Sequence, residues 1–533
     1  MTIEQLIEAL ARPGVLPGSG GEAPEVVQTH ISAVFLAGDR AFKLKKPVDF
    51  GFLDFSTAER RAHFCREELR LNRRLAPDIY LGLAPVRFLA DGAVEVGEPV
   101  EEPGRADELL VAMVRLPRER MMDRLLAEGG VDAADVERIG RLVASFHERA
   151  ATGPGVDEHG TREAAGRLAL ENFDQTEGFR GRFFDADLHG TMRRRTAGFL
   201  ESRGRLFEHR VRHGRIRDGH GDLHSPNICL LGDGRPVIYD CIEFSPAYRC
   251  GDVASEVAFL SMDLEWRGRP DLARAFVRAY LDHAGDRHLE SLLPFYQSYR
   301  AMVRAKVSAL TAAADEVDPQ VREGSAEAAR TLFALAERKT RGLHPPTLVA
   351  LAGLTGVGKS RLADELRHGA GLVPLETDRI RKHLAGLDPE RPAPAAPGEG
   401  IYTAEMTRAT YLALAREAAG RLEAGESALA VGTFTARWQR EELRRVAAEH
   451  GVPFLLVLLD APGEVVLERL RARQPGVSDG NEEVYRRMRA SAEPPDELPD
   501  SELLRIDATE EPERLAERVL ARLRAPFGEE GAS

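Results

Sequence analysis

One short stretch constrains the fold of this chain more than any other. Residues 348–360 read LVALAGLTGVGKS, an apolar run that breaks into a glycine-rich turn, and a helical pattern follows over residues 361–368. The spacing fits the Walker A pattern G-x-x-x-x-G-K-[ST], in which glycines let successive backbone N–H groups turn inward around a phosphate chain. Lys359 would reach the β- and γ-phosphates, and Ser360 would hold Mg²⁺. The sequence therefore predicts a nucleoside triphosphate site. Its expected residues are Gly353, Gly356, Val357, Gly358, Lys359 and Ser360.

Length and charge limit what else the chain can be. A chain of 533 residues is too long for one hydrophobic core, so about two to four domains are expected. The net charge of −13 makes a nucleic-acid partner unlikely. The four cysteines are scattered, which indicates reduced thiols and no structural zinc site. The longest apolar stretch, residues 454–459, is too short to span a membrane. We expect a cytoplasmic protein without a membrane partner.

Lysine is rare in this chain, so each lysine is informative. Seven lysines stand among 73 basic residues. Two of them, Lys43 and Lys45, lie in the second half of a hairpin predicted over residues 33–47, around the turn Gly38-Asp39. Because side chains alternate along a strand, both lysines would share one face. Glu68, in the helix predicted to follow, is a candidate to pair with one of them.

A second chemical motif lies over residues 219–231, which form a turn-rich loop running into a short strand. Asp222 and Asn227 are spaced like the Asp and Asn in H-R-D-L-x-x-x-N of protein kinases. In that arrangement the carboxylate accepts a hydroxyl proton, and the amide oxygen holds Mg²⁺. Asp240, at the end of the next predicted strand, takes the metal-binding place of the Asp in D-F-G.

The residues His220-Gly-Asp-Leu-His224, Asn227 and Asp240-Cys-Ile-Glu243 resemble the catalytic signature of the aminoglycoside phosphotransferase family, small-molecule kinases with a protein-kinase-like fold. The resemblance runs from about Thr29 to the helical region before residue 340. It implies Asp222 as catalytic base, Asn227 and Asp240 as Mg²⁺ ligands, and a hairpin lysine on the phosphates of ATP. Lys43 and Lys45 both fit the last role, and we prefer Lys43 paired with Glu68. No G-x-G-x-x-G precedes Lys43, so the usual phosphate-covering loop is missing or shortened.

Strands and helices alternate after the linker-like residues 341–346. Strands predicted at residues 348–352, 372–375, 428–431 and 454–459 indicate a parallel sheet with helices on both faces. We therefore predict two domains, residues 1–342 and 347–533. The first is an α+β two-lobed protein-kinase-like domain, and the second is an α/β P-loop domain.

The second domain has its own candidate catalytic residues. Asp378 ends a strand next to the P-loop strand, where a carboxylate can accept a hydroxyl proton, and Arg381 can clamp an anionic group. This context resembles P-loop kinases related to polynucleotide kinase, zeta toxins and gluconate kinase, and AAA-type ATP-binding domains. The resemblance implies a mobile lid over residues 468–473, with Arg469 and Arg473 offsetting charge on the phosphoryl group. The strand at residues 428–431 ends without an acid.

These motifs together predict a bifunctional kinase. Each domain would use ATP and Mg²⁺ to transfer a γ-phosphoryl group to the hydroxyl of a small molecule. One alternative is a nucleotide sensor in which a catalytically weak domain gates the other. Another is a polynucleotide 5′-hydroxyl kinase.

Overall fold

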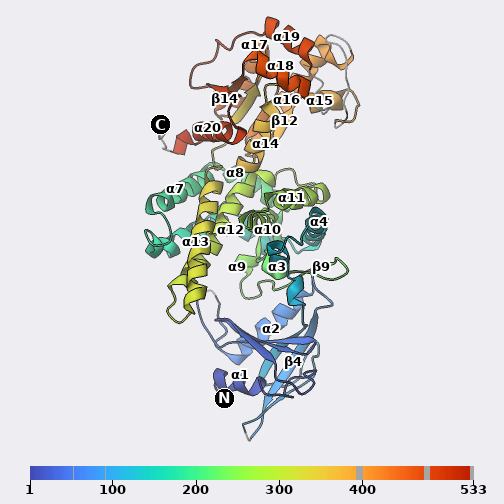
Figure 1. Cartoon of the computed structure of the whole chain (residues 1–533), viewed down its shortest axis with the longest axis vertical. Coiled ribbons are helices and arrows are strands. Elements are labelled where there is room, and N and C mark those ends of the chain that lie inside the picture. Colours follow the sequence, from blue (N-terminus) through green and yellow to red (C-terminus); the bar gives the residue numbers. More distant parts are fainter. Residues whose placement is uncertain (52, 91, 390, 392–399, 473–480, 528–533) are drawn as a thin grey trace. The chain divides into compact units, whose positions relative to one another are not determined.

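The computed structural model describes the chain except for residues 52, 91, 390, 392–399, 473–480 and 528–533. Contacts divide the chain into two compact units (Figure 1). Unit 1 comprises Met1–Gly160 and Gly214–Asp286, and unit 2 comprises Thr161–His213 and Arg287–Ser533. Unit 2 thus combines helices that precede residue 343 with the P-loop region. The domain boundary expected at residues 343–346 stays a prediction.

Unit 1 begins with an antiparallel sheet of six strands in the order β1-β2-β3-β6-β4-β5. The predicted hairpin is present, because Ala37 pairs with Arg40 across a turn where Gly38 has a φ of 59°. Helix α1 (Ile3–Leu10) also belongs to this region, and α2 (Ala58–Asn72) follows the hairpin. The strands are β1 (Glu25–Gln28), β2 (Ser32–Ala37), β3 (Arg40–Lys45), β4 (Tyr80–Phe88), β5 (Val94–Val96) and β6 (Glu108–Val114).

The alternation of side chains along β3 separates its two faces. Phe42 and Leu44 are fully buried in a core that also contains Leu6 and Leu10 of α1. Lys43 and Lys45 take the opposite face, where both reach Glu68 on α2. A single strand therefore joins the hydrophobic core to a cluster of charges.

The remainder of unit 1 is mostly helical and carries the second motif on a small antiparallel ribbon. Strands β8 (Ile228–Leu230) and β9 (Pro236–Ile238) pair directly, so the loop before β8 and the segment after β9 leave the same ribbon. The other helices and strands are α3 (Met122–Ala127), α4 (Ala133–Arg149), α5 (Pro154–Asp157), β7 (Ile216–Asp218), α9 (Pro246–Arg249), β10 (Cys250–Asp252), α10 (Val253–Trp266) and α11 (Pro270–Ala284).

Unit 2 contains a parallel sheet of five strands in the order β12-β13-β11-β14-β15. Helices cover both faces, as the alternating pattern predicts. Leu362 and Val519 belong to the core on one face, and Leu414 and Leu443 to the core on the other. The strands are β11 (Leu348–Ala352), β12 (Pro374–Glu376), β13 (Ala428–Val431), β14 (Phe454–Asp460) and β15 (Leu503–Asp507).

The helices of unit 2 fall into two groups along the sequence. Those within the P-loop region are α14 (Lys359–Ala370), α15 (Thr377–Leu384), α16 (Ala404–Glu423), α17 (Arg437–Glu449), α18 (Gly463–Ala472), α19 (Glu482–Ser491) and α20 (Pro512–Arg524). Those that precede it are α6 (Arg162–Thr176), α7 (Ala186–Ser202), α8 (Gly204–Arg212), α12 (Leu293–Ala313) and α13 (Pro319–Thr340). The mixed fold class predicted from the sequence is confirmed by these two sheets and their helices.

Buried polar contacts join the preceding helices to the amino-terminal edge of the parallel sheet. The guanidinium of Arg203 donates to the carbonyl oxygens of His344 (3.0 Å) and Gly425 (3.1 Å) and to Ser427 Oγ (2.9 Å). Glu290 pairs with Arg367 of α14 at 2.7 Å. Burial lowers the pKa of Arg203 to about 10. These contacts leave the opposite, carboxyl-terminal edge of the sheet for ligands.

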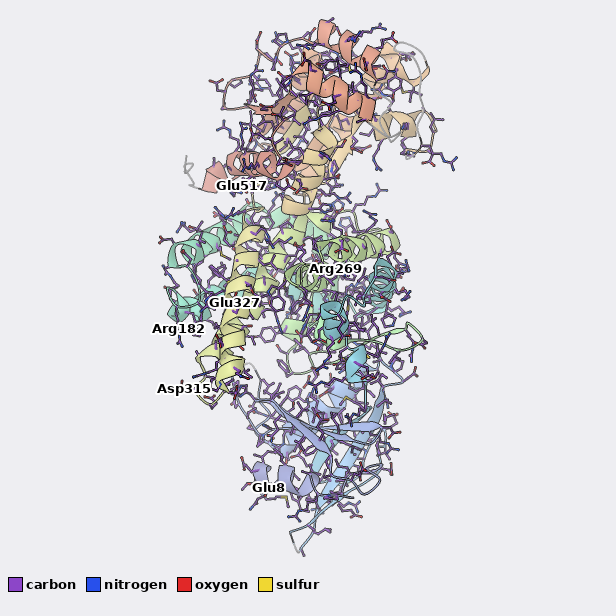
Figure 2. The ribbon with its side chains drawn as sticks, viewed as in Figure 1. Glu8, Arg182, Arg269, Asp315, Glu327 and Glu517 are labelled. Atoms are coloured by element: carbon purple, nitrogen blue, oxygen red, sulfur yellow. The ribbon has the colours of Figure 1, made fainter. Side chains whose placement is uncertain are left out.

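Most charged side chains in the described part of the chain are exposed, in contrast to the buried Arg203. Glu8 on α1 and Glu327 on α13, both labelled in Figure 2, are examples. Arg203 is only 3% exposed. None of the helices among the described residues is long and apolar enough to cross a membrane.

We predict that Arg203→Ala destabilises unit 2 by about 2–4 kcal/mol, because the buried oxygens it serves lose their donors. Chemical denaturation of the full chain measures the loss. Arg212→Ala, which removes an exposed arginine from α8, is the control. Equal denaturation midpoints for the two variants would contradict a stabilising role for Arg203.

Candidate active sites

A buried carboxylate in unit 1 lies between two lysines. Lys43 Nζ is 2.9 Å from Glu68 Oε1, and Lys45 Nζ is 2.6 Å from Glu68 Oε2. Lys43 also contacts Asp240 Oδ1 at 2.8 Å. Lys45 makes a second ion pair with Glu243 and lies over the ring of Phe55, 4.8 Å from its centroid. The structure thus brings together residues from β3, α2 and the segment after β9.

The electrostatics of this cluster keep Glu68 charged. Burial alone would raise the pKa of Glu68, but the ammonium groups of Lys43 and Lys45 outweigh it and hold the pKa at about 2. Burial raises the pKa of Glu243, against the opposing effect of Lys45. The pKa of Lys43 stays well above its usual value because its carboxylate neighbours outweigh burial. Both lysines therefore carry a positive charge.

Exposure distinguishes the two lysines that the sequence leaves open. The Lys43 side chain is 14% exposed, whereas that of Lys45 is 2% exposed and held between two buried carboxylates. Lys43 also contacts Asp240, whose side chain is 45% exposed. Lys43 therefore has the better access to a phosphate, and Lys45 has the surroundings of a structural ion pair.

The loop before β8 brings the predicted base and the predicted metal ligand together. Asn227 Nδ2 donates to the carbonyl oxygen of Asp222 (2.9 Å) and to Asp222 Oδ2 (2.8 Å). Because the amide nitrogen is used in this way, the amide oxygen is the group that Asn227 can offer to a cation. His224 Nε2 lies 3.2 Å from the same Oδ2 atom.

A buried glutamate that sequence reasoning missed anchors this loop. Glu256 of α10 accepts hydrogen bonds from the backbone N–H groups of His220 and Gly221, and His147 Nε2 lies 2.7 Å from its other oxygen. Burial would raise the pKa of Glu256, but these partners lower it to about 2. The available signal is a carboxylate within a helix that is buried almost throughout and otherwise mainly apolar.

Asp240 is held in an unusual backbone conformation. Its φ of 63° is left-handed, which costs an L-residue roughly 1 kcal/mol or more. The Asp240 N–H donates to the hydroxyl of Tyr80 at 3.2 Å, and the N–H of Cys241 donates to Asn72 Oδ1 at 2.8 Å. Helix α2 thus supplies both Glu68 and Asn72 to the site, and Tyr80 comes from β4.

The residues of this site fit Mg²⁺. Asp240 and Asn227 offer oxygen donors, which Mg²⁺ prefers, and Mg²⁺ is usually held by one or two carboxylates together with phosphate oxygens. No group of three or more His, Cys, Asp or Glu residues that could hold a metal ion occurs in the described part of the chain. A cation here would therefore depend on the nucleotide for part of its coordination.

The glycine-rich loop of unit 2 adopts the expected strand-loop-helix arrangement between β11 and α14. Gly353, Gly356 and Gly358 have φ values of 148°, 78° and 117°. A Cβ on Gly353 would lie 2.7 Å from the carbonyl oxygen of Leu459, so no larger residue fits. Lys359 Nζ donates to the carbonyl oxygens of Gly353 (2.8 Å) and Leu354 (3.0 Å). Ser360 lies in the first turn of α14, and Val357 lies between the last two glycines.

Asp378 and Arg381 both lie on α15, directly after β12 at the carboxyl-terminal edge of the sheet. Arg381 is 6% exposed and lies over the ring of Tyr402, 4.9 Å from its centroid. It donates to Thr407 Oγ1 at 3.2 Å, while its Nε is buried and has no hydrogen-bond partner in the described part of the chain. Among the described residues, Arg381 makes no ion pair with a carboxylate.

The segment predicted as a lid lies partly against the P-loop. Arg469 of α18 donates to the carbonyl oxygens of Val357 and Ala508, each at 2.9 Å. A Cβ on Gly356 would lie 2.7 Å from Leu470 Cγ, so α18 packs directly on the loop. Arg473, the other lid arginine, lies outside the described residues. After β13 the chain continues with Gly432 and Thr433, without an acid, as the sequence indicates.

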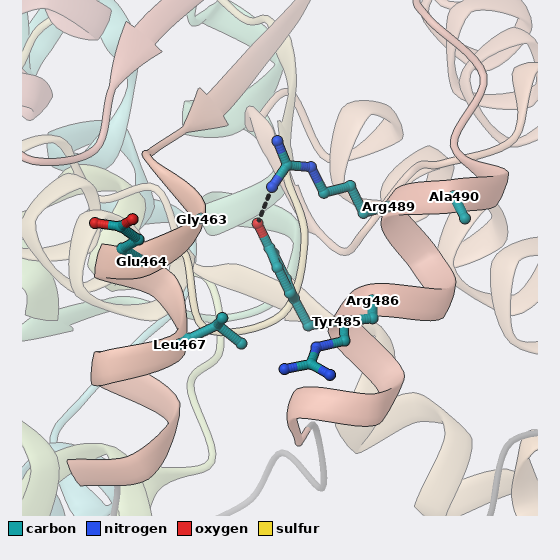
Figure 3. A pocket seen from close by; sticks show the side chains of 7 residues that line it. All are labelled: Gly463, Glu464, Leu467, Tyr485, Arg486, Arg489 and Ala490. Atoms are coloured by element: carbon teal, nitrogen blue, oxygen red, sulfur yellow. Dashed lines mark hydrogen bonds between the residues drawn. The ribbon is translucent and has the colours of Figure 1, made fainter.

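Another face of α18 borders a cleft of about 540 Å³ shared with α19 (Figure 3). On the α19 side of this cleft, Arg489 donates to the hydroxyl of Tyr485, one helical turn earlier, at 3.3 Å. None of the predicted site residues lines it. The lining residues are Gly463, Glu464, Leu467, Tyr485, Arg486, Arg489 and Ala490.

The chain combines a part with a protein-kinase-like fold and a part with a P-loop fold. Residues 348–495 match the family described as "AAA domain". "Uncharacterized protein Rv2004c" of Mycobacterium tuberculosis is 33% identical over 462 residues, which cover 86% of this chain and 88% of the relative. "Uncharacterized protein Mb2027c" of Mycobacterium bovis has the same identity and coverage. The chain belongs to the family of these mycobacterial proteins.

Two solved structures are similar to separate parts of the chain. A choline/ethanolamine kinase family protein from Mesorhizobium loti is 15% identical and covers 64% of this chain and 99% of its own, with a TM-score of 0.37. A gluconokinase from Sinorhizobium meliloti is 20% identical and covers 34% of this chain and 94% of its own, with a TM-score of 0.26.

The different surroundings of Lys43 and Lys45 predict that one substitution affects ATP binding and the other affects stability. Lys45→Met should destabilise unit 1 by about 3–5 kcal/mol, because it leaves buried carboxylates without a partner. Lys43→Met should cost less stability, because Lys45 still neutralises Glu68, but it should weaken ATP binding. Thermal unfolding and calorimetric ATP titration of the full chain measure the two effects. The assignment of Lys43 to phosphate binding and of Lys45 to stability is wrong if Lys45→Met is fully stable but binds ATP less tightly.

Proposed function

We propose that the protein is a bifunctional ATP-dependent phosphotransferase with one site in each unit. The proposal rests above all on the cluster in unit 1, where Lys43 makes ion pairs with both Glu68 and Asp240. A lysine held by a buried carboxylate beside a half-exposed metal-binding aspartate is the arrangement that a kinase needs around the phosphates of ATP. The acceptor in each site is a hydroxyl group of a small molecule.

In unit 1 the proposed roles follow from position. Lys43 binds phosphate oxygens, and Asp240 and Asn227 hold Mg²⁺, which neutralises charge on the phosphates. The acceptor hydroxyl oxygen bonds to the γ-phosphorus while the bond from that phosphorus to the bridging oxygen of ADP breaks. Asp222 accepts the hydroxyl proton, so the charge that develops on the acceptor is removed as the new bond forms.

In unit 2 the loop N–H groups and Lys359 bind the triphosphate, and Ser360 holds Mg²⁺. Asp378 accepts the proton of the acceptor hydroxyl. Arg469, already against Val357, offsets charge near the loop. Arg381 binds an anionic group of the acceptor, because a buried guanidinium without a carboxylate partner retains strong affinity for an anion. The acceptor of this unit therefore carries a carboxylate or phosphate besides its hydroxyl.

A nucleotide sensor is the second candidate function. Two observations favour it: β13 ends without an acid that could assist Mg²⁺, and the hairpin before Lys43 lacks the usual glycine-rich pattern. In that case one unit binds ATP without consuming it. A polynucleotide kinase is a further alternative for unit 2, although the net charge of −13 disfavours binding to a polyanion. A radiolabelled 5′-hydroxyl oligonucleotide tests it directly.

We predict that Asp222→Asn lowers phosphoryl transfer by unit 1 by a factor on the order of 10²–10⁴, because the hydroxyl proton loses its acceptor. Transfer is followed as ADP formation and as the ATP-dependent mass gain of an acceptor in a metabolite extract. The matched variant Asp218→Asn alters a structural partner of Arg249 in the same region. Turnover unchanged in Asp222→Asn argues that unit 1 is a sensor or uses another base.

Lys359→Ala should abolish ATP binding by unit 2, because the triphosphate loses its lysine and the loop loses the hydrogen bonds to Gly353 and Leu354. Calorimetric titration of the full chain should therefore show two nucleotide sites in the native protein and one in the variant. Arg416→Ala, on an exposed face of α16, is expected to keep both sites. Two sites in Lys359→Ala would refute the nucleotide-binding role of the loop.

A further inference from the structure

One buried histidine contacts the proposed catalytic base and is not part of the roles described above. His224 Nε2 lies 3.2 Å from Asp222 Oδ2, and the His224 side chain is 6% exposed. Its ring stacks on Phe259 of α10, with centroids 5.1 Å apart and planes inclined by 20°. The next residue, Ser225, donates its N–H to the buried carboxylate of Asp263 at 3.0 Å. His224 is therefore fixed by packing on one side and by the loop on the other.

The hydrogen-bond network determines which ring nitrogen of His224 carries the proton. Nδ1 is buried and has no hydrogen-bond partner among the described residues, whereas Nε2 lies 3.2 Å from Asp222 Oδ2 and 3.4 Å from Asn227 Nδ2. An N–H buried without an acceptor costs more than a lone pair buried without a donor. The proton therefore lies on Nε2, which donates to Asp222.

The same geometry gives no support to a proton relay through the imidazole. A relay would pass the acceptor proton from Asp222 to His224 and out through Nδ1, as in a catalytic triad. In the described part of the chain, Nδ1 has no hydrogen-bond partner that could take a proton from it. His224 can therefore orient and polarise the carboxylate, but it does not carry the proton away.

Asp222 Oδ2 thus receives two donors, the imidazole N–H and the amide N–H of Asn227. Two donors from different directions hold the carboxylate in one rotamer, although the side chain is 34% exposed. Asn227 alone is a poor anchor, because in the proposed mechanism its amide plane must also present an oxygen to Mg²⁺.

We propose that His224 is a positioning residue that holds the carboxylate of Asp222 in the orientation needed to accept the hydroxyl proton. The inference rests on the proposed role of Asp222 as base. It assigns to His224 an effect on the rate of transfer, and none on the binding of ATP, which unit 1 holds through Lys43 and Asp240.

Two substitutions separate the hydrogen bond from the packing. His224→Phe keeps a ring on Phe259 but has no N–H, whereas His224→Gln loses the ring but places an amide N–H near the position of Nε2. Both are made in the full chain carrying Lys359→Ala, which silences unit 2. The probe is ATP with Mg²⁺, water taking the place of the acceptor hydroxyl, and ADP release gives kcat and KM.

His224→Phe should lower kcat by a factor on the order of 10–100, as expected for the loss of a hydrogen bond to a charged group, with KM for ATP unchanged. His224→Gln should recover most of the rate. Thermal unfolding shows whether either variant is folded.

Several results would overturn the proposal. The first is a rate in His224→Phe equal to that of the parent chain. The second is an equal loss in both variants, or a loss that appears in KM, since each indicates a role in packing. Asp222→Asn in the same background identifies failure of the underlying mechanism: ADP release that does not depend on Asp222 refutes the proposed function of unit 1, and the inference with it.

Discussion

The charge of Glu68 is the constraint on which the architecture of unit 1 depends. A carboxylate buried to this degree is stable only with positive partners, and two lysines on alternate positions of β3 supply them. Each lysine then reaches a second carboxylate on the segment after β9. One buried charge therefore connects β3, α2 and the segment after β9. The rest of the site in unit 1, including the strained backbone of Asp240, is built around this connection.

The second unit uses buried charge in a different place. Arg203, Glu290 and Glu426 lie at the amino-terminal edge of the parallel sheet, where they join helices from the middle of the chain to the P-loop fold. Glu426 is fully buried and accepts a hydrogen bond from Ser291. Polar contacts cover this edge, whereas the P-loop, Asp378 and Arg381 lie at the opposite edge. The charged groups that join the helices to the sheet and the predicted site residues thus lie at opposite edges of one sheet.

Much of the fold can be predicted from the sequence because the signals that specify it are local. The glycine spacing, the hairpin turn and the apolar strands are each set by neighbours a few residues apart, and all appear in the structure near their predicted positions. The strand Leu503–Asp507 and the anchoring role of Glu256 were not foreseen. A short strand at the edge of a sheet has a weak pattern of its own, and a glutamate in an apolar helix becomes meaningful only when its partners are known.

What the sequence by itself determined is the pair of chemical motifs, because a phosphate loop and a base-to-metal-ligand spacing are defined within a dozen residues. The tertiary structure decided which of the two lysines is more exposed, how the Asp222 carboxylate is oriented, and which helices belong with the P-loop. Lys43 and Asp240 are 197 residues apart in sequence, and Arg203 and Ser427 are 224 apart. Contacts over such separations arise only when the chain closes on itself, and burial then determines which charges must pair and which remain available for chemistry.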